Sequence, residues 1–555
     1  MKKLTKLASL LLALAIAVSL TACSGGGTFS SSGGGTFSSS GGGSSTASET
    51  EGNSSTAEEG GTATTASFEV ATVRWTDAWP TDFLETGIMK EIEEKTGVDI
   101  TWQVYYNGDW AEQKSLLLAS GDLPDAFWGS ISLTDTDVNQ NKSLFVELTD
   151  LIANNMPNLN RVFETDPSMK AIITDRNGEI YSLPKKLPLR PQVNDVMYIN
   201  QTWLDALDLE MPDTYEDLEA VLEAFVTQDP NGNGENDEFG YSAQQGLDGD
   251  LRHLMAPFGT MVCRSGNYMA LDDNGDPIFM PIQENYKEAV KWVNGLYQKG
   301  LLDPECFTQD SSMVTAKTQD PSGSLSGIVF GWTADAQVGV NAKDYVPVPA
   351  LAGPDGNRYA EHNPEFLDVS RNELIITTSC EDPATLLKWA DEYYTDEASL
   401  QTFYGSISDG KIQANDDGTY EVLVPEDGSS LDTSAWSFSM RDFGPKYMNE
   451  EFYDKVTLPA DQGDGIKLAE DPINEEYIVT TFPVCAYTEE QTQRLASLTT
   501  NIYDYCESQY SHWVVDGGID EEWDAYLQQL DAMGLQEYIS IQVDAYNAYQ
   551  ESLGE

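Results

Sequence analysis

The stretch FEVATVRW, residues 68 to 75, has the apolar pattern of a β-strand and starts the alternation that decides the fold. The segment after it is expected to be a helix, because its apolar residues share one face: Leu84, Ile88, Met89 and Ile92. VDITWQVY, residues 98 to 105, returns to the two-residue period of a strand. Strand, helix and strand in this order predict a mostly parallel sheet with right-handed crossovers.

The same alternation continues along the chain. A helix through KSLLLAS and a short strand at DAFWG, residues 125 to 129, come next. Thr214 with Asp217, and Thr488 with Gln491, have the spacing of capping boxes, so each pair is expected to open a helix. The last clear helix is expected to run from Ile519 to Gly534, and further strands are expected at 326 to 332, 344 to 350 and 373 to 378.

The chain from Phe68 onward is too long for one hydrophobic core, since single cores stop growing at about 250–300 residues. Two irregular stretches, KKLPLRPQVND at 185 to 195 and AGPDGNRYAEHNPEF at 352 to 366, are expected to be crossings between two lobes. We predict six parts: a signal peptide (1–22), a lipidated Cys with a Gly/Ser-rich tether (23–67), an N-terminal lobe (68–190), a C-terminal lobe (191–365), a return to the N-terminal lobe (366–440) and a helical region shared between the lobes (441–555).

The first residues have the form of a secretory signal, with three lysines followed by an apolar run from Leu7 to Leu20. LTAC, followed by Ser24 and Gly25, resembles a bacterial lipobox, which implies cleavage before Cys23 and a diacylglycerol on its sulfur. The alternative is a plain signal peptide with an incidental cysteine. The Gly/Ser-rich repeats after Cys23 are expected to form a flexible tether that spans roughly 35–40 Å on average. The acyl chains of the diacylglycerol on Cys23 would be the only membrane anchor.

Composition excludes several classes of partner. The 92 acidic and 30 basic residues give a formal net charge of −62, which disfavours nucleic acid. The five cysteines after Cys23 lack metal-ligand or disulfide-framework spacing and are expected to be small buried residues: Cys263, Cys306, Cys380, Cys485 and Cys506. The three histidines, His253, His362 and His512, are far apart in sequence, so a zinc centre is not expected.

Four stretches match a known family when taken in order: ASGDLPDAFW (119–128), GEIYSLP (178–184), MYINQTWLDALDLEMPDTYEDL (197–218) and GIDEEWDAYLQQLDAMGLQEY (518–538). They resemble the extracellular solute-binding lipoproteins of carbohydrate ABC importers, family 1 type, which are related to the alginate-binding periplasmic proteins. The resemblance implies an α/β, two-lobed periplasmic-binding-protein fold of type II-like form. It also implies a monomer without catalytic residues, tethered outside the cell membrane of a Gram-positive bacterium, that closes on an oligosaccharide and delivers it to the transmembrane subunits of an ABC permease.

DPNGNGENDEFG, residues 229 to 240, is similar to a calcium-binding loop. Oxygen donors occupy loop positions 1, 3, 5, 7 and 9, in the order Asp229, Asn231, Asn233, Glu235 through its carbonyl, and Asp237. Gly240 stands where an EF-hand has a bidentate Glu, and Glu238 is the expected substitute, as the resemblance to the alginate-binding proteins implies. Because no second amphipathic helix follows, we expect a structural Ca²⁺ rather than a sensor. The alternative is an Asn/Gly turn without metal.

Sugars are expected to bind to aromatic rings and polar side chains near strand ends and lobe crossings. Trp203, Trp292, Trp389 and Trp523 fall on helix faces and are expected in cores. The candidates for ligand binding are Trp79, Trp128, Arg190, Asn194, Trp332, Glu361, Tyr404 and Trp436, with Trp75 and His362 nearby in sequence. For each of them, a core or solvated hinge position is the alternative.

Two other function classes stay open at this stage. A surface glycoside hydrolase needs only two carboxylates, which the sequence cannot exclude, although motifs such as GxSxG, HExxH and a P-loop are absent. A receptor of the same fold for peptides, or for signalling, is the third class, because a fold does not fix its ligand.

Overall fold

The structure is a computed structural model that describes residues 66–187, 191–193, 195–244, 251–260, 268–272, 274–361, 369–479 and 481–553. Only the backbone is described at positions 361, 432–433 and 552–553. All of these residues belong to one compact unit, Gly61–Glu555. Within the described ranges, no helix has the length and apolar character needed to cross a membrane.

A six-stranded sheet forms the centre of the first lobe. Its strand order is β15-β4-β12-β3-β1-β2, where the strands are β1 (Ala66–Arg74), β2 (Val98–Tyr106), β3 (Ala126–Trp128), β4 (Leu183–Lys186), β12 (Val369–Ile376) and β15 (Lys446–Tyr447). β1 pairs in parallel with both β2 and β3, as the sequence predicts. β12 pairs antiparallel with β3 and β4, so a strand from late in the chain is inserted into the middle of this sheet.

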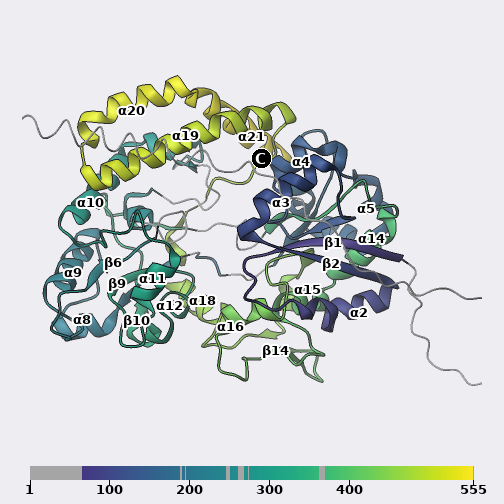
Figure 1. Ribbon diagram of the computed structural model, residues 1–555, viewed down its shortest axis with the longest axis horizontal. Coiled ribbons are helices and arrows are strands. Elements are labelled where there is room, and N and C mark those ends of the chain that lie inside the picture. The colour runs from purple at the N-terminus through teal and green to yellow at the C-terminus, as the bar shows by residue number, and fades with distance from the viewer. Residues whose placement is uncertain are drawn as a thin grey trace, which may run out of the picture. The chain divides into compact units, whose positions relative to one another are not determined.

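Both faces of β1 are buried, because its alternating residues enter two different cores. Phe68 and Val70 join the core that also holds Ile88, Met89 and Trp128, whereas Ala71 and Val73 join the core of Trp110 and Phe127. Figure 1 shows α2 (Gly87–Thr96) and α3 (Asn107–Ser120) on opposite sides of the sheet. The other helices of this lobe are α4 (Asp135–Gln140), α5 (Thr149–Asn155), α6 (Pro157–Thr165), α7 (Ser168–Ile173), α14 (Pro383–Asp391) and α15 (Asp396–Tyr404).

The second lobe contains a four-stranded sheet of order β10-β5-β9-β6. Its strands are β5 (Val196–Asn200), β6 (Phe239–Tyr241), β9 (Ser326–Gly331) and β10 (Tyr345–Pro347). β5 pairs antiparallel with β9 and β10, and only β6 pairs in parallel with β9. The expectation of a mostly parallel sheet is therefore wrong for this lobe, because strand direction depends on long-range pairing that the local pattern does not encode.

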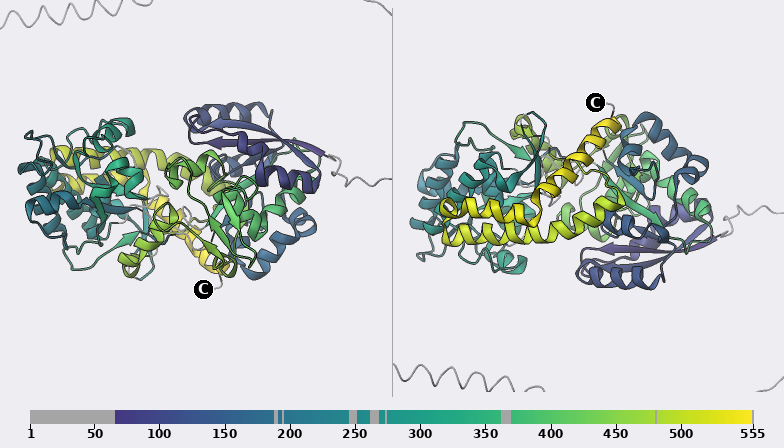
Figure 2. Two further views of the ribbon diagram at one scale, coloured as in Figure 1. Left: turned by 90° about the horizontal axis from the view of Figure 1, so that it is seen from below. Right: turned by 90° about the horizontal axis from the view of Figure 1, so that it is seen from above.

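Helices surround the second sheet and continue to the C-terminus. They are α8 (Gln201–Leu207), α9 (Tyr215–Thr227), α10 (Glu284–Gln298), α11 (Ser311–Thr318), α12 (Ala334–Val338), α19 (Glu489–Asp516), α20 (Ile519–Met533) and α21 (Leu535–Leu553). The capping boxes at Thr214 and Thr488 form as predicted. Figure 2 shows α19 and α20 side by side. α20 ends at Gly534 as expected, but it is not the last helix, since α21 follows at once.

A third core was not anticipated from the sequence. It gathers Leu400, Phe403, Ile412 and Val422 around a small sheet of β13 (Ile412–Ala414), β14 (Tyr420–Val422) and β16 (Val456–Thr457). Short elements complete the described chain: β7 (Met269–Leu271), β8 (Pro277–Phe279), β11 (Ala360–Glu361), β17 (Ile478–Val479), α16 (Leu431–Ser434), α17 (Glu450–Tyr453), α18 (Asp464–Glu470) and nine 3-10 turns, among them η1 (Asp82–Glu85), η3 (Leu251–Phe258), η7 (Ala435–Ser437) and η8 (Asp471–Ile473).

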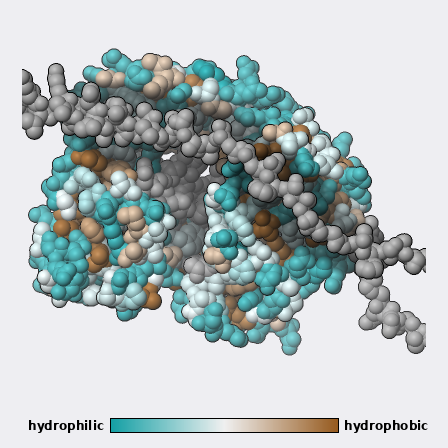
Figure 3. All heavy atoms as spheres, in the orientation of Figure 1, coloured by the Kyte–Doolittle hydropathy of each residue, from teal (hydrophilic) through white to brown (hydrophobic). Residues whose placement is uncertain are grey.

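The surface agrees with the composition of the chain. The face in Figure 3 is mostly hydrophilic, and apolar residues are scattered over it in small groups. Cys306, Cys380, Cys485 and Cys506 are buried free thiols, and Cys263 lies outside the described residues.

The backbone of Gly444 packs directly against the first core, with no space for a side chain. Its φ is +90°, and an added Cβ would lie 2.1 Å from ring atoms of Trp128. Gly121, at the C-terminus of α3, has a φ of +72° but open space around its Cβ position. We expect Gly444→Ala to lower the free energy of unfolding by about 1–3 kcal/mol more than Gly121→Ala does, because only the first adds overpacking to backbone strain. Urea denaturation of both variants measures this difference, and equal losses would contradict it.

Candidate functional site

Four aromatic rings lie together near the carboxyl end of β1: Trp75, Trp79, Trp436 and Phe443. We call this group the aromatic platform. The rings of Trp79 and Trp436 are stacked, with centroids 5.4 Å apart and an interplanar angle of 11°. Phe443 lies 5.5 Å from Trp436 and 5.9 Å from Trp75. Trp75 is 45% exposed, and Trp79 and Trp436 are half-buried. Ring faces in this arrangement suit the flat CH faces of a sugar.

Two distant segments build this platform. Trp75 and Trp79 follow directly after β1, whereas Trp436 and Phe443 come from residues 430–447, which lead into β15 and which we call the return segment. Residues 439–445, which we call the return strap, have no regular structure before β15 begins at Lys446. Several main-chain polar groups of the return strap are therefore satisfied by side chains.

Buried charged side chains hold the return strap on the sheet. The ammonium of Lys446 donates to the carbonyls of Phe443 and Gly444 at 2.5 and 3.0 Å, and Lys185 Nζ donates to the carbonyl of Asp442 at 2.5 Å. Glu373 Oε2 accepts from the backbone N–H of Gly444 at 2.7 Å. Burial lowers the pKa of Lys446 to about 7, with repulsion from Lys185 acting in the same direction.

Trp332 is the predicted ring on the second lobe, and it follows β9. It is half-buried, and the ammonium of Lys467 lies 5.1 Å from its ring centroid. The Tyr198 hydroxyl donates to the Trp332 carbonyl at 3.1 Å and to Glu470 Oε2 at 2.7 Å. Trp332 is thus fixed by polar contacts to α18 and β5.

α18 and the turn after it are attached to both lobes. At its start, Asp464 accepts from the Tyr404 hydroxyl at 3.0 Å and pairs with Arg441 at 3.3 Å. Directly after its end, Asp471 accepts from the backbone N–H groups of Gln192 and Val193 at 2.7 and 3.2 Å. A further bond, from Ser430 Oγ to Asp335 Oδ2 at 2.7 Å, links the segment before Trp436 to the helix after Trp332.

The 229–238 loop has the polar groups of a cation site. Gly232 and Gly234 have positive φ angles, and the N–H of Gly234 donates to Asp229 Oδ2 at 3.0 Å. Asp229 Oδ1 and both carboxylate oxygens of Glu238 are buried and accept no hydrogen bond from any residue that the structure describes. Burial raises the pKa of Glu238, the expected effect on a carboxylate that lacks a counter-charge.

The other polar side chains of this loop include amides as well as carboxylates, and they are hydrogen-bonded to one another. Asn233 donates to both oxygens of Asp237, at 3.1 and 3.3 Å, and Asn231 donates to Asp237 at 3.4 Å. In the part of the chain that the structure describes, no three His, Cys, Asp or Glu side chains are grouped for a metal ion. A cation in this loop would therefore need amide and main-chain oxygens beside the carboxylates.

Comparison with known proteins places the chain in a family. The model of the bacterial extracellular solute-binding proteins matches residues 77–399, more than half of the chain. The chain belongs to this family. The curated protein FusA of Streptococcus pneumoniae, a fructooligosaccharide ABC transporter substrate-binding protein, is 33% identical over 489 residues, which cover 85% of this chain and 88% of FusA. Lipoprotein LipO of Bacillus subtilis is 27% identical over 288 residues, 49% of this chain and 53% of LipO.

Solved structures of solute-binding proteins share the fold. Structures of Streptococcus pneumoniae FusA with kestose, and of its EF-hand mutant with fructo-nystose, each match with a TM-score of 0.77 at 30% identity, over 87% of this chain and 99% of theirs. An HMO-binding solute-binding protein of Bifidobacterium longum infantis matches with a TM-score of 0.75 at 26% identity, over 87% and 99%. Alginate-binding AlgQ2 without calcium matches in fold, with a TM-score of 0.67 at 21% identity, over 88% and 99%.

These comparisons confirm the family and the mixed α/β periplasmic-binding-protein fold predicted from the sequence. They also favour binding over catalysis and speak against the glycoside hydrolase hypothesis, because the family consists of solute-binding proteins.

Burial removes two candidates from the solute-binding site. Trp128 is fully buried between Trp102, Trp389 and Tyr393, and its indole N–H has no hydrogen-bond partner among the described residues. Tyr404 is 3% exposed. Neither ring presents a face to a ligand. Trp128 ends β3, which the inserted strand β12 covers, and Tyr404 ends α15 and packs into the third core.

The remaining candidates differ in what the structure describes. Trp79 and Trp436 lie together in the aromatic platform, and Trp332 lies on the second lobe. Glu361 is in β11, which pairs with β17, and only its backbone is described. Arg190, Asn194, His362 and Cys23 lie outside the described residues. The helix tryptophans Trp203, Trp389 and Trp523 are buried in cores as expected, and Trp292 is partly buried.

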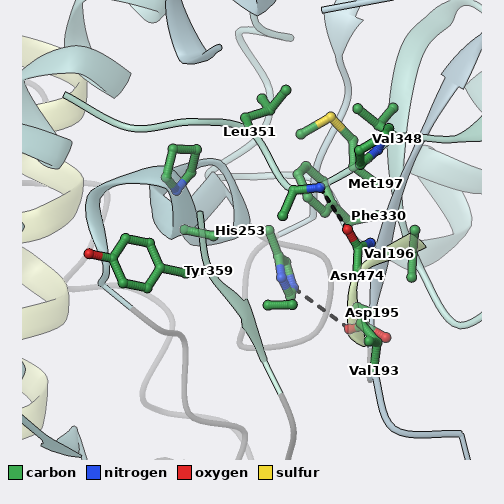
Figure 4. A pocket seen from close by; sticks show the side chains of 15 residues that line it. Val193, Asp195, Val196, Met197, His253, Phe330, Val348, Leu351, Tyr359 and Asn474 are labelled. Carbon is green, nitrogen blue, oxygen red and sulfur yellow. Dashed lines mark hydrogen bonds and ion pairs between the residues drawn. The ribbon is translucent and has the colours of Figure 1, made fainter. Parts of the chain in front are cut away.

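A small cavity lies where the crossings of the chain meet (Figure 4). It is lined by Val193 and Asp195 of the first predicted crossing, by Leu351 just before the second and Tyr359 within it, and by Asn474. In Figure 4, His253 lies beside Asp195, with a closest distance of 3.8 Å, and the Asn474 side chain accepts from the N–H of Ala350 at 2.7 Å. Its volume of about 80 Å³ is below the range of ligand pockets, so this cavity is too small to hold a saccharide.

Sequence reasoning missed Phe443 and Arg74. Phe443 was within the loop that contains Trp436, and an aromatic residue beside a glycine in such a loop was an available signal. Arg74 was visible as a charge near the end of an otherwise apolar strand.

The return strap predicts a pH dependence of stability. Because the pKa of Lys446 is about 7 in the folded chain and its ordinary value is 10.5, the unfolded chain binds more protons between these pH values. The contribution of Lys446 to the free energy of unfolding therefore rises with pH from about 7 to 10.

We expect the free energy of unfolding of the wild type, minus that of Lys446→Met, to increase across this window. Urea denaturation at pH 7, 8.5 and 10 measures it. A difference that stays constant with pH would show that Lys446 keeps its ordinary pKa.

Proposed function

We propose that this protein is the oligosaccharide-binding component of an ABC importer. The observation that carries the proposal is the aromatic platform. Its exposed Trp75 and half-buried Trp79 and Trp436 pack on the buried Phe443 at the carboxyl end of a parallel strand, where ligands bind in open α/β sheets. FusA, which is named for fructooligosaccharides, supports the same ligand class.

Binding requires both lobes in this proposal. Trp79 and Trp436 stack on each other and offer the parts of their rings that stay exposed on the first lobe, and Trp332 does so on the second. The Ser430–Asp335 bond places the segments of Trp436 and Trp332 in the same region. Closure of the lobes on a sugar is favoured by contacts that exist only in the closed form, because a ligand shifts an equilibrium through its differential affinity. Arg190, Asn194 and Glu361 of the crossings are proposed to add hydrogen bonds.

A structural Ca²⁺ in the 229–238 loop is part of the proposal. The orphaned, buried oxygens of Asp229 and Glu238 fit a cation, with Asn231, Asn233, Asp237 and the carbonyl of Glu235 as further oxygen donors. The ion would supply positive charge that offsets the burial of these carboxylates. The loop joins α9 to β6, so its order affects the second lobe.

The predicted lipid anchor on Cys23 and the tether of residues 23–67 complete the proposal. LipO of Bacillus subtilis is named a lipoprotein, which supports an anchored form of the chain. Lipidation at Cys23 would hold a monomer at the outer face of the cell membrane, beside the transmembrane subunits of the permease.

Alanine variants of the proposed contact residues test the saccharide site. We expect Trp332→Ala and Trp436→Ala each to weaken kestose binding more than tenfold, about 1.4 kcal/mol, because a stacking face is lost. Isothermal titration measures the affinities, and chromatography checks that the recovered kestose is intact.

Trp523→Phe, in the core of the C-terminal helices, is the control and should bind kestose as the wild type does. Unchanged affinity in both alanine variants would refute the site. If the wild type binds no fructooligosaccharide, a thermal-shift screen of other oligosaccharides and of peptides decides whether the ligand is a sugar.

Calcium is tested on chelator-treated protein. We expect added Ca²⁺ to raise the thermal midpoint of the wild type, since a ligand present at 100 times its Kd stabilises by about 2.7 kcal/mol. Glu238→Gln should lose most of this gain, because it removes a buried carboxylate. Asp272→Asn, in another acidic turn, is the control and should keep the full gain. A wild type whose midpoint does not respond to Ca²⁺ would eliminate the site.

A further inference from the structure

Arg74 is the last residue of β1 and is 1% exposed. Its guanidinium forms no ion pair with a carboxylate in the described ranges, and the interactions that shift its pKa are burial, which lowers it to about 10, and the charge of Tyr106, which raises it. Arg74 therefore remains a cation at neutral pH. A buried charge without a counter-charge is costly, and an apolar side chain in its place would avoid that cost. Stability of the core therefore does not explain why an arginine occupies position 74.

The hydrogen bonds of Arg74 to main-chain carbonyls go to the segment that carries Trp436 of the aromatic platform. One terminal nitrogen donates to the carbonyl of Trp436, and the other donates to the carbonyl of Ser439 at 3.3 Å. The guanidinium carbon lies 5.8 Å from the ring centroid of Trp436 and 5.1 Å from that of Phe83, within the range of a cation–π contact. Arg74 thus binds both the backbone and the ring of Trp436.

These contacts join segments that are far apart in sequence. Arg74 directly precedes Trp75, and the Trp436 carbonyl that it holds is 362 residues later in the chain. The turn at 435–437 has no side-chain cap of its own, so its position on the first sheet depends on contacts from other segments. The stacking of Trp436 on Trp79 needs this turn to be placed accurately, because aromatic pairs have preferred geometries.

We propose that Arg74 is a positioning residue of the saccharide site, which fixes Trp436 against Trp79 without touching the ligand. This inference rests on the proposed function for its effect on binding. A planar guanidinium reaches two carbonyls from two nitrogens while it lies over a ring, and the compact ammonium of lysine cannot do all three. Arginine is therefore required at position 74, and a positive charge alone is not sufficient.

The experiment compares Arg74→Met and Arg74→Lys with the wild type, using two measurements on the full folded chain. Near-ultraviolet circular dichroism without ligand reports the exciton coupling of the Trp79–Trp436 stack, and Trp436→Ala identifies which part of the signal this pair produces. Isothermal titration with kestose reports binding. We expect both Arg74 variants to lose the Trp79–Trp436 signal and to bind kestose at least tenfold more weakly.

Arg252→Met is the matched control. Arg252 is also buried, pairs with Glu507 at 2.6 Å and lies over the Tyr510 ring. These contacts connect Arg252 of η3 to α19. We expect this variant to lose stability, because it removes a buried guanidinium and its ion pair with the partly exposed Glu507, yet to keep the Trp79–Trp436 signal and wild-type affinity. The Arg74 variants should lower the thermal midpoint no more than Arg252→Met does.

Three results would overturn the inference. They are an unchanged Trp79–Trp436 signal in Arg74→Met, wild-type affinity in Arg74→Lys, or a loss of signal that accompanies general loss of far-ultraviolet dichroism in both variants. Failure of the proposed function is distinguishable, because it appears as wild-type affinity in Trp436→Ala or as no saccharide binding by the wild type. The near-ultraviolet dichroism without ligand measures the positioning of Trp436 whether or not the protein binds a saccharide.

Discussion

The antiparallel pairing of β12 with β3 and β4 is the constraint on which the arrangement of the first lobe depends. After β4 the chain leaves this sheet and builds the strands of the second lobe, and β12 brings it back into the middle of the sheet. This insertion brings the return segment, with Trp436 and Phe443, to the carboxyl end of β1. It also ensures that more than one chain crossing joins the lobes, which is the covalent basis of a hinge.

Buried charges connect this topology to the candidate site. The return strap is irregular, and Lys185, Glu373 and Lys446 bind its main-chain groups from the sheet below. Unpaired backbone groups in a buried loop are costly, so these side chains provide what a helix or strand would otherwise provide. In a chain with a net charge of −62, cations are few, and several of those that are buried lie beside the segments that carry the platform.

Contacts between the lobes pass through α18, whose ends are held by different parts of the chain. Asp464 is bound by Arg441 and Tyr404, and Asp471 is bound by the first crossing. Lys467, between them, lies over Trp332. A ligand that contacts Trp332 therefore acts on a residue that is packed against a connection between the lobes, which offers a physical route from binding to closure.

The sequence by itself determined the strands β1, β2, β3 and β9, the helix starts at Thr214 and Thr488, and the family, because periodicity, capping and ordered motifs are local features. It also singled out the rings of Trp79 and Trp436 as candidates. Only the tertiary structure decided that Trp128 and Tyr404 are buried, that the second sheet is mainly antiparallel and that Arg74 holds Trp436. Each of these depends on residues that are distant in sequence or on the direction of a pairing strand. Local patterns encode the form of a segment, whereas its neighbours are fixed only when the whole chain packs.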